Sequence, residues 1–146
     1  MTRLFSKEQR MEFEACVAIE APIEKVFALY ADVGAWKTWD PDVKSSSIEG
    51  SFVSGALGTL QPTKGPKAKI FFKEVVPNSS FTVESKLPLC VIRFEHELSK
   101  VNGQTQAIHR VIFEGVLSPV FGRLIGRQIE KALPHTLEGL KRAVEM

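Results

Sequence analysis

The stretch VIRFEHELSKVNGQTQAIHRVIFEG, residues 91–115, decides the fold. It contains two runs in which apolar and polar residues alternate, one on each side of Asn102-Gly103. Alternation with a period of two is typical of half-buried strands, and Asn-Gly between two such runs favours a two-residue type I′ turn. This turn pairs Val101 with Gln104. The stretch is therefore predicted to be an antiparallel hairpin with a fixed register.

That register places two histidines face to face. His96 lies opposite His109, both on the apolar side of the hairpin, with Cβ atoms roughly 4.5–5.5 Å apart. The apolar side comprises Cys90, Ile92, Phe94, His96 and Leu98 on the first strand and Ala107, His109, Val111 and Phe113 on the second. On the other side Glu95 faces Arg110, and this pair of opposite charges supports the register. A slip of one residue would turn one histidine outward.

The rest of the chain adds strands before the hairpin and a long helix after it. Residues 12–20 alternate as a strand, Ala21-Pro22 opens a short helix, and a second short helix is expected at 35–38. After Ser118, the expected N-cap, an apolar helical stripe continues to about Val144, with a kink expected at Pro134. The strands expected after the short helices are 43–49, 57–63, 68–76, 80–87, 89–100 and 104–117, separated by Gly, Pro and Asn.

This order predicts an α+β fold in one domain spanning residues 1–146, with 1–11 as an N-terminal lead-in. Hairpin-length connections make the strands sequentially antiparallel. The terminal helix is the element long enough to cover the apolar face of the sheet. If the sheet curves around this helix without full contact, a cavity remains between them.

Four segments resemble the START-like superfamily, also described as Bet v 1-like or SRPBCC, which includes the polyketide cyclase/dehydrase and lipid transport group. They are APIEKVFALYADVGAWKTWDPDV (21–43), GSFVSGALGTL (50–60), FEHELSKVNGQTQAIHRVIFEG (94–115) and PVFGRLIGRQIEKALPHTLEGLKR (119–142). The resemblance extends over residues 12–144. It implies a helix-grip fold, in which a curved seven-stranded antiparallel sheet surrounds a long C-terminal helix over a hydrophobic cavity, with two short helices after the first strand. The superfamily includes lipid carriers, hormone receptors and cyclases, so function has to be argued from the site.

Composition excludes several classes of function. The 146 residues include 19 basic and 17 acidic ones, a net charge of +2, so we expect no nucleic-acid partner. No run reaches the 18 or so apolar residues of a membrane span, so we expect no stable membrane insertion and a cytoplasmic location. Cys16 and Cys90 lie far apart in apolar runs and are expected to be buried free thiols. No nucleotide, catalytic-triad or zinc motif is present, and no cofactor is expected.

The histidine pair is open to four interpretations. His96 and His109 could anchor a carbonyl or hydroxyl of an apolar ligand, or act as general acid and base, since histidine titrates near neutral pH. They could form half of a metal site, although no inward cysteine or carboxylate accompanies them. They could also be two partly buried histidines bonded to each other or to water.

Other candidate residues surround the predicted cavity. Trp36 and Trp39 follow the first helix, where the resemblance places the mouth of the cavity; alternatively, both rings close the core. Phe121 and Ile125 on the terminal helix line either the cavity or the core. The ligand-binding candidates are Trp36, Trp39, Ile92, Phe94, His96, His109, Val111, Phe113, Phe121 and Ile125.

The sequence therefore predicts binding, and possibly transport, of a hydrophobic small molecule such as a lipid, polyketide or aromatic compound. The alternative is a polyketide cyclase, aromatase or dehydratase-like enzyme that uses His96 or His109 as acid or base. A third option is an interaction module whose cavity is filled by side chains. Both monomer and homodimer are compatible with the pattern.

Overall fold

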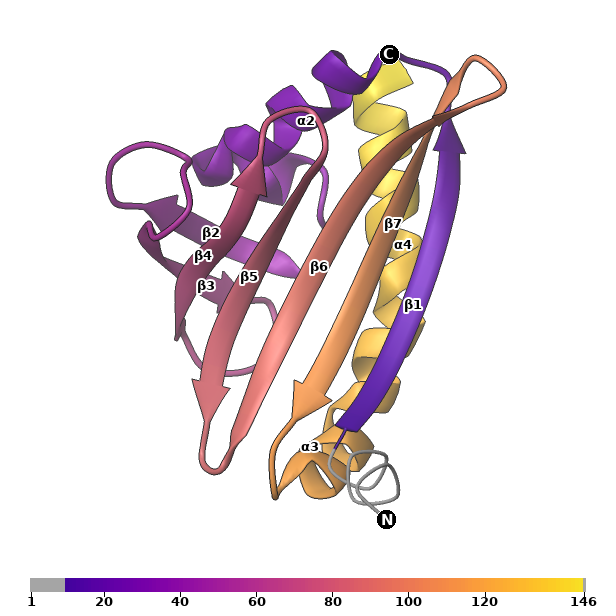
Figure 1. Cartoon of the computed structure of the whole chain (residues 1–146). Helices are drawn as coiled ribbons and strands as arrows, with labels where there is room; N and C mark the ends of the chain where they lie inside the picture. The colour runs from indigo at the N-terminus through magenta and orange to yellow at the C-terminus, as the bar shows by residue number, and fades with distance from the viewer. Residues whose placement is uncertain (1–9, 146) are drawn as a thin grey trace.

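A computed structural model describes residues 10–145, so residues 1–9 of the expected lead-in lie outside the described part (Figure 1). Seven strands form one antiparallel sheet in the order β1-β7-β6-β5-β4-β3-β2, and the chain ends in a long helix. The elements are β1 (Arg10–Ile19), α2 (Ile23–Ala31), η1 (Val33–Thr38), β2 (Val43–Ile48), β3 (Leu57–Pro62), β4 (Ala68–Val76), β5 (Ser80–Leu87), β6 (Cys90–Val101), β7 (Gln104–Glu114), α3 (Ser118–Leu124) and α4 (Gly126–Glu145). This is the predicted α+β helix-grip architecture, with the short helices α2 and η1 after the first strand.

The β6–β7 hairpin has the predicted register. Val101 pairs with Gln104, and His96 pairs with His109. Asn102 and Gly103 have φ values of 52° and 78°, the left-handed conformation that a type I′ turn requires at both central positions. The turn residues thus set the face of every side chain along both strands.

The terminal helix is interrupted at a different place from the one predicted. The break falls at Ile125, between α3 and α4, whereas α4 runs through Pro134. Pro134 and Glu130, whose carbonyl loses its intrahelical partner, both lie on the exposed side. The expected N-cap was also wrong: Leu117 is the N-cap of α3, and the buried Oγ of Ser118 has no partner among the described residues.

Two apolar clusters fill the space between the sheet and the helices. The larger one joins α2, η1 and β4 to the last turns of α4, around Tyr30, Phe72 and Leu140. The smaller one lies toward α3, around Val111 and Phe113. Phe94 packs against both clusters. Since α4 packs chiefly along β1 (Figure 1), the middle of the sheet depends on other side chains for cover.

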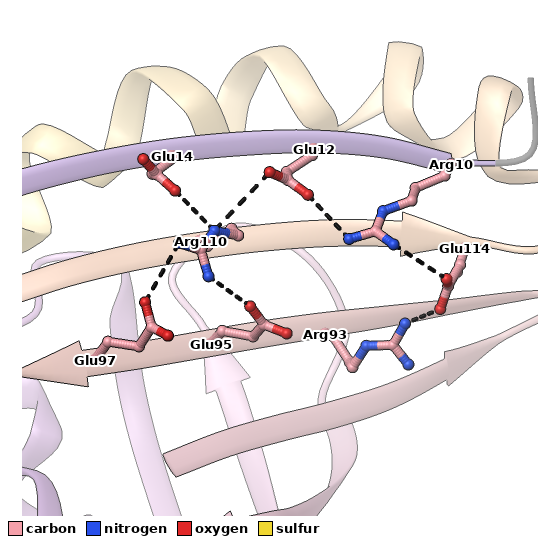
Figure 2. Close-up of polar contacts among 8 residues, drawn as sticks. All are labelled: Arg10, Glu12, Glu14, Arg93, Glu95, Glu97, Arg110 and Glu114. Carbon is pink, nitrogen blue, oxygen red and sulfur yellow. Dashed lines mark hydrogen bonds and ion pairs between the residues drawn. The ribbon is translucent and has the colours of Figure 1, made fainter. Parts of the chain in front are cut away.

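The outer face of the sheet carries a network of ion pairs (Figure 2). Arg110 lies 2.7 Å from Glu14, 2.8 Å from Glu95 and 3.3 Å from Glu97. The predicted pair of Glu95 and Arg110 is therefore confirmed. Arg93 pairs in turn with Glu114. Glu14 and Glu97 are about half exposed, at 49% and 50%, so water screens their attraction to Arg110, and Glu95, at 29%, is the least screened partner.

The two cysteines differ in exposure. Both are free thiols, as predicted, but Cys16 is exposed whereas Cys90 is buried. The prediction that both are buried was therefore wrong for Cys16. Residue 16 follows Ala15 and precedes Val17, both on the inner face of β1, so the pleat directs Cys16 outward.

Candidate functional site

The two histidines meet on the inner face of the sheet. Their ring centroids are 4.6 Å apart, with an angle of 73° between the ring planes. His109 is 4% exposed, whereas His96 is half-buried. The predicted pair therefore exists, and one of its members retains contact with solvent.

Tyr30 is a third member of the site that sequence reasoning missed. Its hydroxyl lies 2.8 Å from Nε2 of His109, and the tyrosine is fully buried. Helical spacing indicates that Tyr30 lies on the apolar face of α2. The sequence does not indicate that α2 crosses the sheet where β6 and β7 carry their histidines, because that depends on how the layers pack.

His96 is held in one orientation by Phe81 of the neighbouring strand β5. The two rings are stacked, with centroids 4.0 Å apart and planes within 3°. Nδ1 of His96 lies 3.2 Å from the backbone oxygen of Phe81. A carbonyl oxygen only accepts, so Nδ1 carries the proton and the neutral ring presents a lone pair at Nε2. Among the described residues, no side chain or backbone group forms a hydrogen bond with that Nε2.

Burial keeps all three polar groups neutral at physiological pH. It lowers the pKa of His96 to about 4. The pKa of His109 lies well below its usual value because of burial and, secondarily, the neighbouring His96. Burial also raises the pKa of Tyr30. Such groups offer hydrogen bonds, but they lack the pKa near ambient pH that suits general acid–base catalysis.

The two tryptophans have different environments. Trp36 is buried on the inner side, where its Nε1 donates to the backbone oxygen of Tyr30 at 2.9 Å. Trp39 packs edge-on against Tyr30, with ring centroids 5.9 Å apart, and lines a surface hollow. Its buried Nε1 has no partner among the described residues.

The other predicted lining residues fall into two groups. Ile92, Val111 and Phe113 are buried core residues of the smaller cluster. Phe121 and Ile125 pack against that cluster and remain half-buried. These five residues are separated from Trp36, which belongs to the larger cluster.

On the inner face of β6, the side chains at the centre of the strand are more exposed than those on either side of them. Ile92 and Leu98 are buried, with 6% and 7% exposed, whereas Phe94 and His96 between them are half-buried. On the neighbouring strands, Val83 and Val111, the partners of Phe94, are buried. A local opening of the core therefore lies at Phe94 and His96.

Neither of two hollows over residues 10–145 is lined by His96 or His109. One, of about 510 Å³, lies on the outer face over Ile112 and is bordered by charged side chains such as Arg93 and Glu84. The other, of about 550 Å³, lies between the segment after η1 and α4. The rings of Tyr30, Phe81 and Trp36 occupy the space around the histidine pair. A ligand cavity at the pair stays a prediction.

Over residues 10–145 no three His, Cys, Asp or Glu side chains gather where they could hold a metal ion. Within the same residues, no helix has the length and apolar character needed to cross a bilayer.

The seven-stranded antiparallel sheet and the long C-terminal helix define a START-like, Bet v 1-like helix-grip domain. Residues 10–145 match the family model described as polyketide cyclase / dehydrase and lipid transport, and the chain belongs to that family. No curated protein sequence matches significantly.

Solved structures show the same fold at low sequence identity. Ara h 8.0201 superposes with a TM-score of 0.72 at 13% identity, covering 92% of this chain and 97% of that one. TTHA0849 from Thermus thermophilus also has a TM-score of 0.72, at 16% identity, with coverage of 92% and 97%. The di-domain ARO/CYC StfQ from the steffimycin biosynthetic pathway gives a TM-score of 0.79 at 12% identity. That match covers 98% of this chain and 53% of StfQ, so this chain spans about half of the di-domain protein.

Proposed function

We propose that the protein binds a hydrophobic small molecule, such as a lipid, polyketide or aromatic compound, on the inner face of the sheet beside Phe94 and His96. The observation that carries the proposal is the local loss of burial at these two residues. Ile92 and Leu98, on either side, are buried, so the partly exposed part of the inner face is limited to Phe94 and His96 at the centre of β6. An apolar surface with a few oriented polar groups is the usual composition of a small-molecule site.

Room for the ligand comes from the connection between β2 and β3. Phe52 in this connection is half-buried, and its ring centroid lies 5.2 Å from that of Phe81. Gly50 and Gly55 flank it with φ values of 80° and 93°, which only glycine adopts freely. Displacement of Phe52 would free apolar surface next to the ring on which His96 stacks.

The tautomer of His96 indicates which hydrophobic small molecules should bind more tightly. Its Nε2 accepts a hydrogen bond, because Nδ1 donates to the Phe81 carbonyl. The Nε2 of His109 is already engaged by Tyr30. The ligand is therefore expected to carry a hydroxyl, and a phenol should bind more tightly than its methyl ether.

The alternative is an enzyme of the cyclase, aromatase or dehydratase kind in which the histidines move protons. The family match is compatible with it. The site supports it less well than binding, because burial holds the pKa of His96 at about 4 and raises that of Tyr30. Turnover of a polyketide-like substrate that is lost in His96→Gln, with binding retained, would establish the enzyme.

The proposed setting is the cytoplasm, with the ligand as the partner and no nucleic acid bound. The free thiols Cys16 and Cys90 suit a reducing compartment. Both a monomer and a homodimer would leave the inner face available.

The test is a fluorescence titration with Nile red, an uncharged apolar dye. Phe94→Gln should weaken binding about tenfold or more, because it places an amide on the apolar surface. Val91→Gln is the matched control, since Val91 is half-buried on the outer face of the same strand. Phe52→Ala should tighten binding.

Two results would count against the proposal. Equal dye affinity in the wild type and Phe94→Gln would move the ligand away from the inner face. Absence of saturable dye binding, in Phe52→Ala as well, would favour a domain filled by its own side chains.

A further inference from the structure

We propose that the hollow between the segment following η1 and the C-terminal half of α4 is a second small-molecule site, which takes an acid on a small apolar body, such as an aryl carboxylate. It is separate from the inner face of the sheet. Trp39 lies between the two, since its ring packs against Tyr30 and the residue also lines the hollow.

The hollow has the size and composition for such a ligand. Its volume of about 550 Å³ falls within the range of small-molecule pockets. Trp39, Pro41 and Ala143 supply apolar wall. The polar groups that line it, Lys37, Thr38, His135 and Arg142, can each donate a hydrogen bond, and no carboxylate lines it.

The fold brings these donors together from two elements. Lys37 belongs to the last turn of η1, and His135 and Arg142 lie about two turns apart on one side of α4. Gly139 lies between them, where a Cβ would stand 2.0 Å from the backbone oxygen of Trp39. The missing side chain at 139 allows the loop to contact the helix, which places the cations around a common space.

A buried donor on a residue that lines the hollow supports the assignment. Nε1 of Trp39 has no acceptor among the described residues, whereas Nε1 of Trp36 donates to Tyr30. Buried polar hydrogens are nearly always paired. Because this Nε1 is buried, an acid in the hollow contacts it only after the side chains around Trp39 shift, and its oxygens then supply the missing acceptor.

The carboxylates near the hollow do not pair with its basic side chains. The carboxylate of Asp40 accepts from Oγ1 of Thr136 at 3.1 Å and from the backbone N–H of Asp42 at 3.0 Å. Asp42 and Glu138 are exposed and do not line the hollow. Within residues 10–145, Lys37, His135 and Arg142 form no ion pair within 4.0 Å, and Glu138 lies one turn before Arg142 along α4.

The test is a titration of ¹⁵N-labelled protein with benzoate, monitored at the two indole N–H signals. Trp39→Phe assigns them. The Trp39 signal should shift saturably, whereas the Trp36 signal, which reports on the inner face, should move little. Benzyl alcohol at the same concentrations should cause no saturable shift, and sodium chloride controls for ionic strength.

A pair of charge variants tests the cations. Arg142→Gln should raise the dissociation constant for benzoate about tenfold, as expected for loss of a charge-assisted hydrogen bond. Arg127→Gln removes the same charge from an exposed position of α4 outside the hollow and should leave the constant unchanged.

Three results would overturn the site. The first is no saturable shift of Trp39 with benzoate, and the second is an equal shift with benzyl alcohol. The third is a larger shift at Trp36 than at Trp39, which would place benzoate on the inner face. Failure of Nile red binding would leave this second site standing, so the two proposals fail independently.

Discussion

His96 should make the stability of the protein depend on pH between 7 and 4 in a way that His96→Gln removes. Glutamine retains an N–H donor for the Phe81 carbonyl but does not titrate. In the unfolded chain His96 takes up a proton near pH 6.5, whereas the folded protein excludes it until the pKa of about 4. Between these values the unfolded state binds more protons, so acidification lowers the free energy of unfolding.

The size of the effect follows from the gap between the two pKa values. Each unit of pKa difference corresponds to about 1.4 kcal/mol, so His96 alone should remove about 3 kcal/mol on going from pH 6.5 to pH 4. Asp40 acts in the opposite direction, because burial raises its pKa from 3.8 to about 6. In the folded protein Asp40 retains a proton that it releases in the unfolded chain. Acidification over the same range therefore raises the free energy of unfolding by about 3 kcal/mol.

His109, whose pKa burial also lowers, acts in the same direction as His96, so acidification destabilises the wild type in spite of Asp40, and variants separate the contributions. Urea unfolding should be measured from pH 7 to pH 4 for the wild type, His96→Gln and Asp40→Asn, with the exposed His135→Gln as control. His96→Gln should lose less stability on acidification than the wild type, and Asp40→Asn should lose more. A slope in His96→Gln equal to that of the wild type would refute a buried, neutral His96.

Three further predictions concern packing, charge and thiol reactivity. Gly139→Ala should lower the free energy of unfolding by about 1–3 kcal/mol despite the better helix propensity of alanine, because its Cβ would overlap the Trp39 carbonyl; thermal unfolding measures this. Arg110→Leu should destabilise the protein by about 1 kcal/mol at low salt and less at 1 M salt, because it leaves the surrounding glutamates repelling one another across solvent-exposed positions; urea unfolding at both salt concentrations measures it. A thiol reagent should modify Cys16 rapidly and Cys90 only on unfolding, because Cys90 is buried and burial raises its pKa; mass spectrometry counts the labels.

Each of these predictions has an outcome that contradicts it. Gly34→Ala is the control for packing, since no atom lies within 4 Å of its added Cβ; equal melting temperatures of the two variants would contradict the contact. A salt-independent loss in Arg110→Leu would assign the effect to packing alone. Equal labelling rates of the two thiols would contradict their different exposure.

The sequence predicts the β6–β7 hairpin well because Asn102-Gly103 encodes its register locally. A type I′ turn fixes which residues pair, and strand alternation then fixes the faces. The two histidines were therefore placed correctly without knowledge of any other element. The outward direction of Cys16 follows from the same alternation. Its apolar neighbours suggested burial, but the position in the strand determines its exposure.

Features that depend on how layers pack were not predictable in the same way. Tyr30 is far from His109 in sequence, and the contact depends on where α2 crosses the sheet. On either side of the break at Ile125, Gly122 and Gly126 allow α3 and α4 to lie against β1, since a Cβ at these positions would meet Met11 and Phe13, and this contact is not encoded locally. Pro134, in contrast, has a strong local signal for a kink, but its position on the exposed side of α4 tolerates the missing hydrogen bond.

The strand order has a consequence for how the chain is made. β1 is the first described strand of the chain, yet its partner in the sheet is β7, which is synthesised after all the others. During translation the meander from β2 to β6 can pair strand by strand as it emerges, whereas β1 has no partner until residues 105–114 leave the ribosome. Contacts of such long sequence separation form slowly. For most of its synthesis the nascent chain therefore carries a strand with alternating apolar and polar residues and no hydrogen-bonding partner. We expect a chaperone to bind this segment before others.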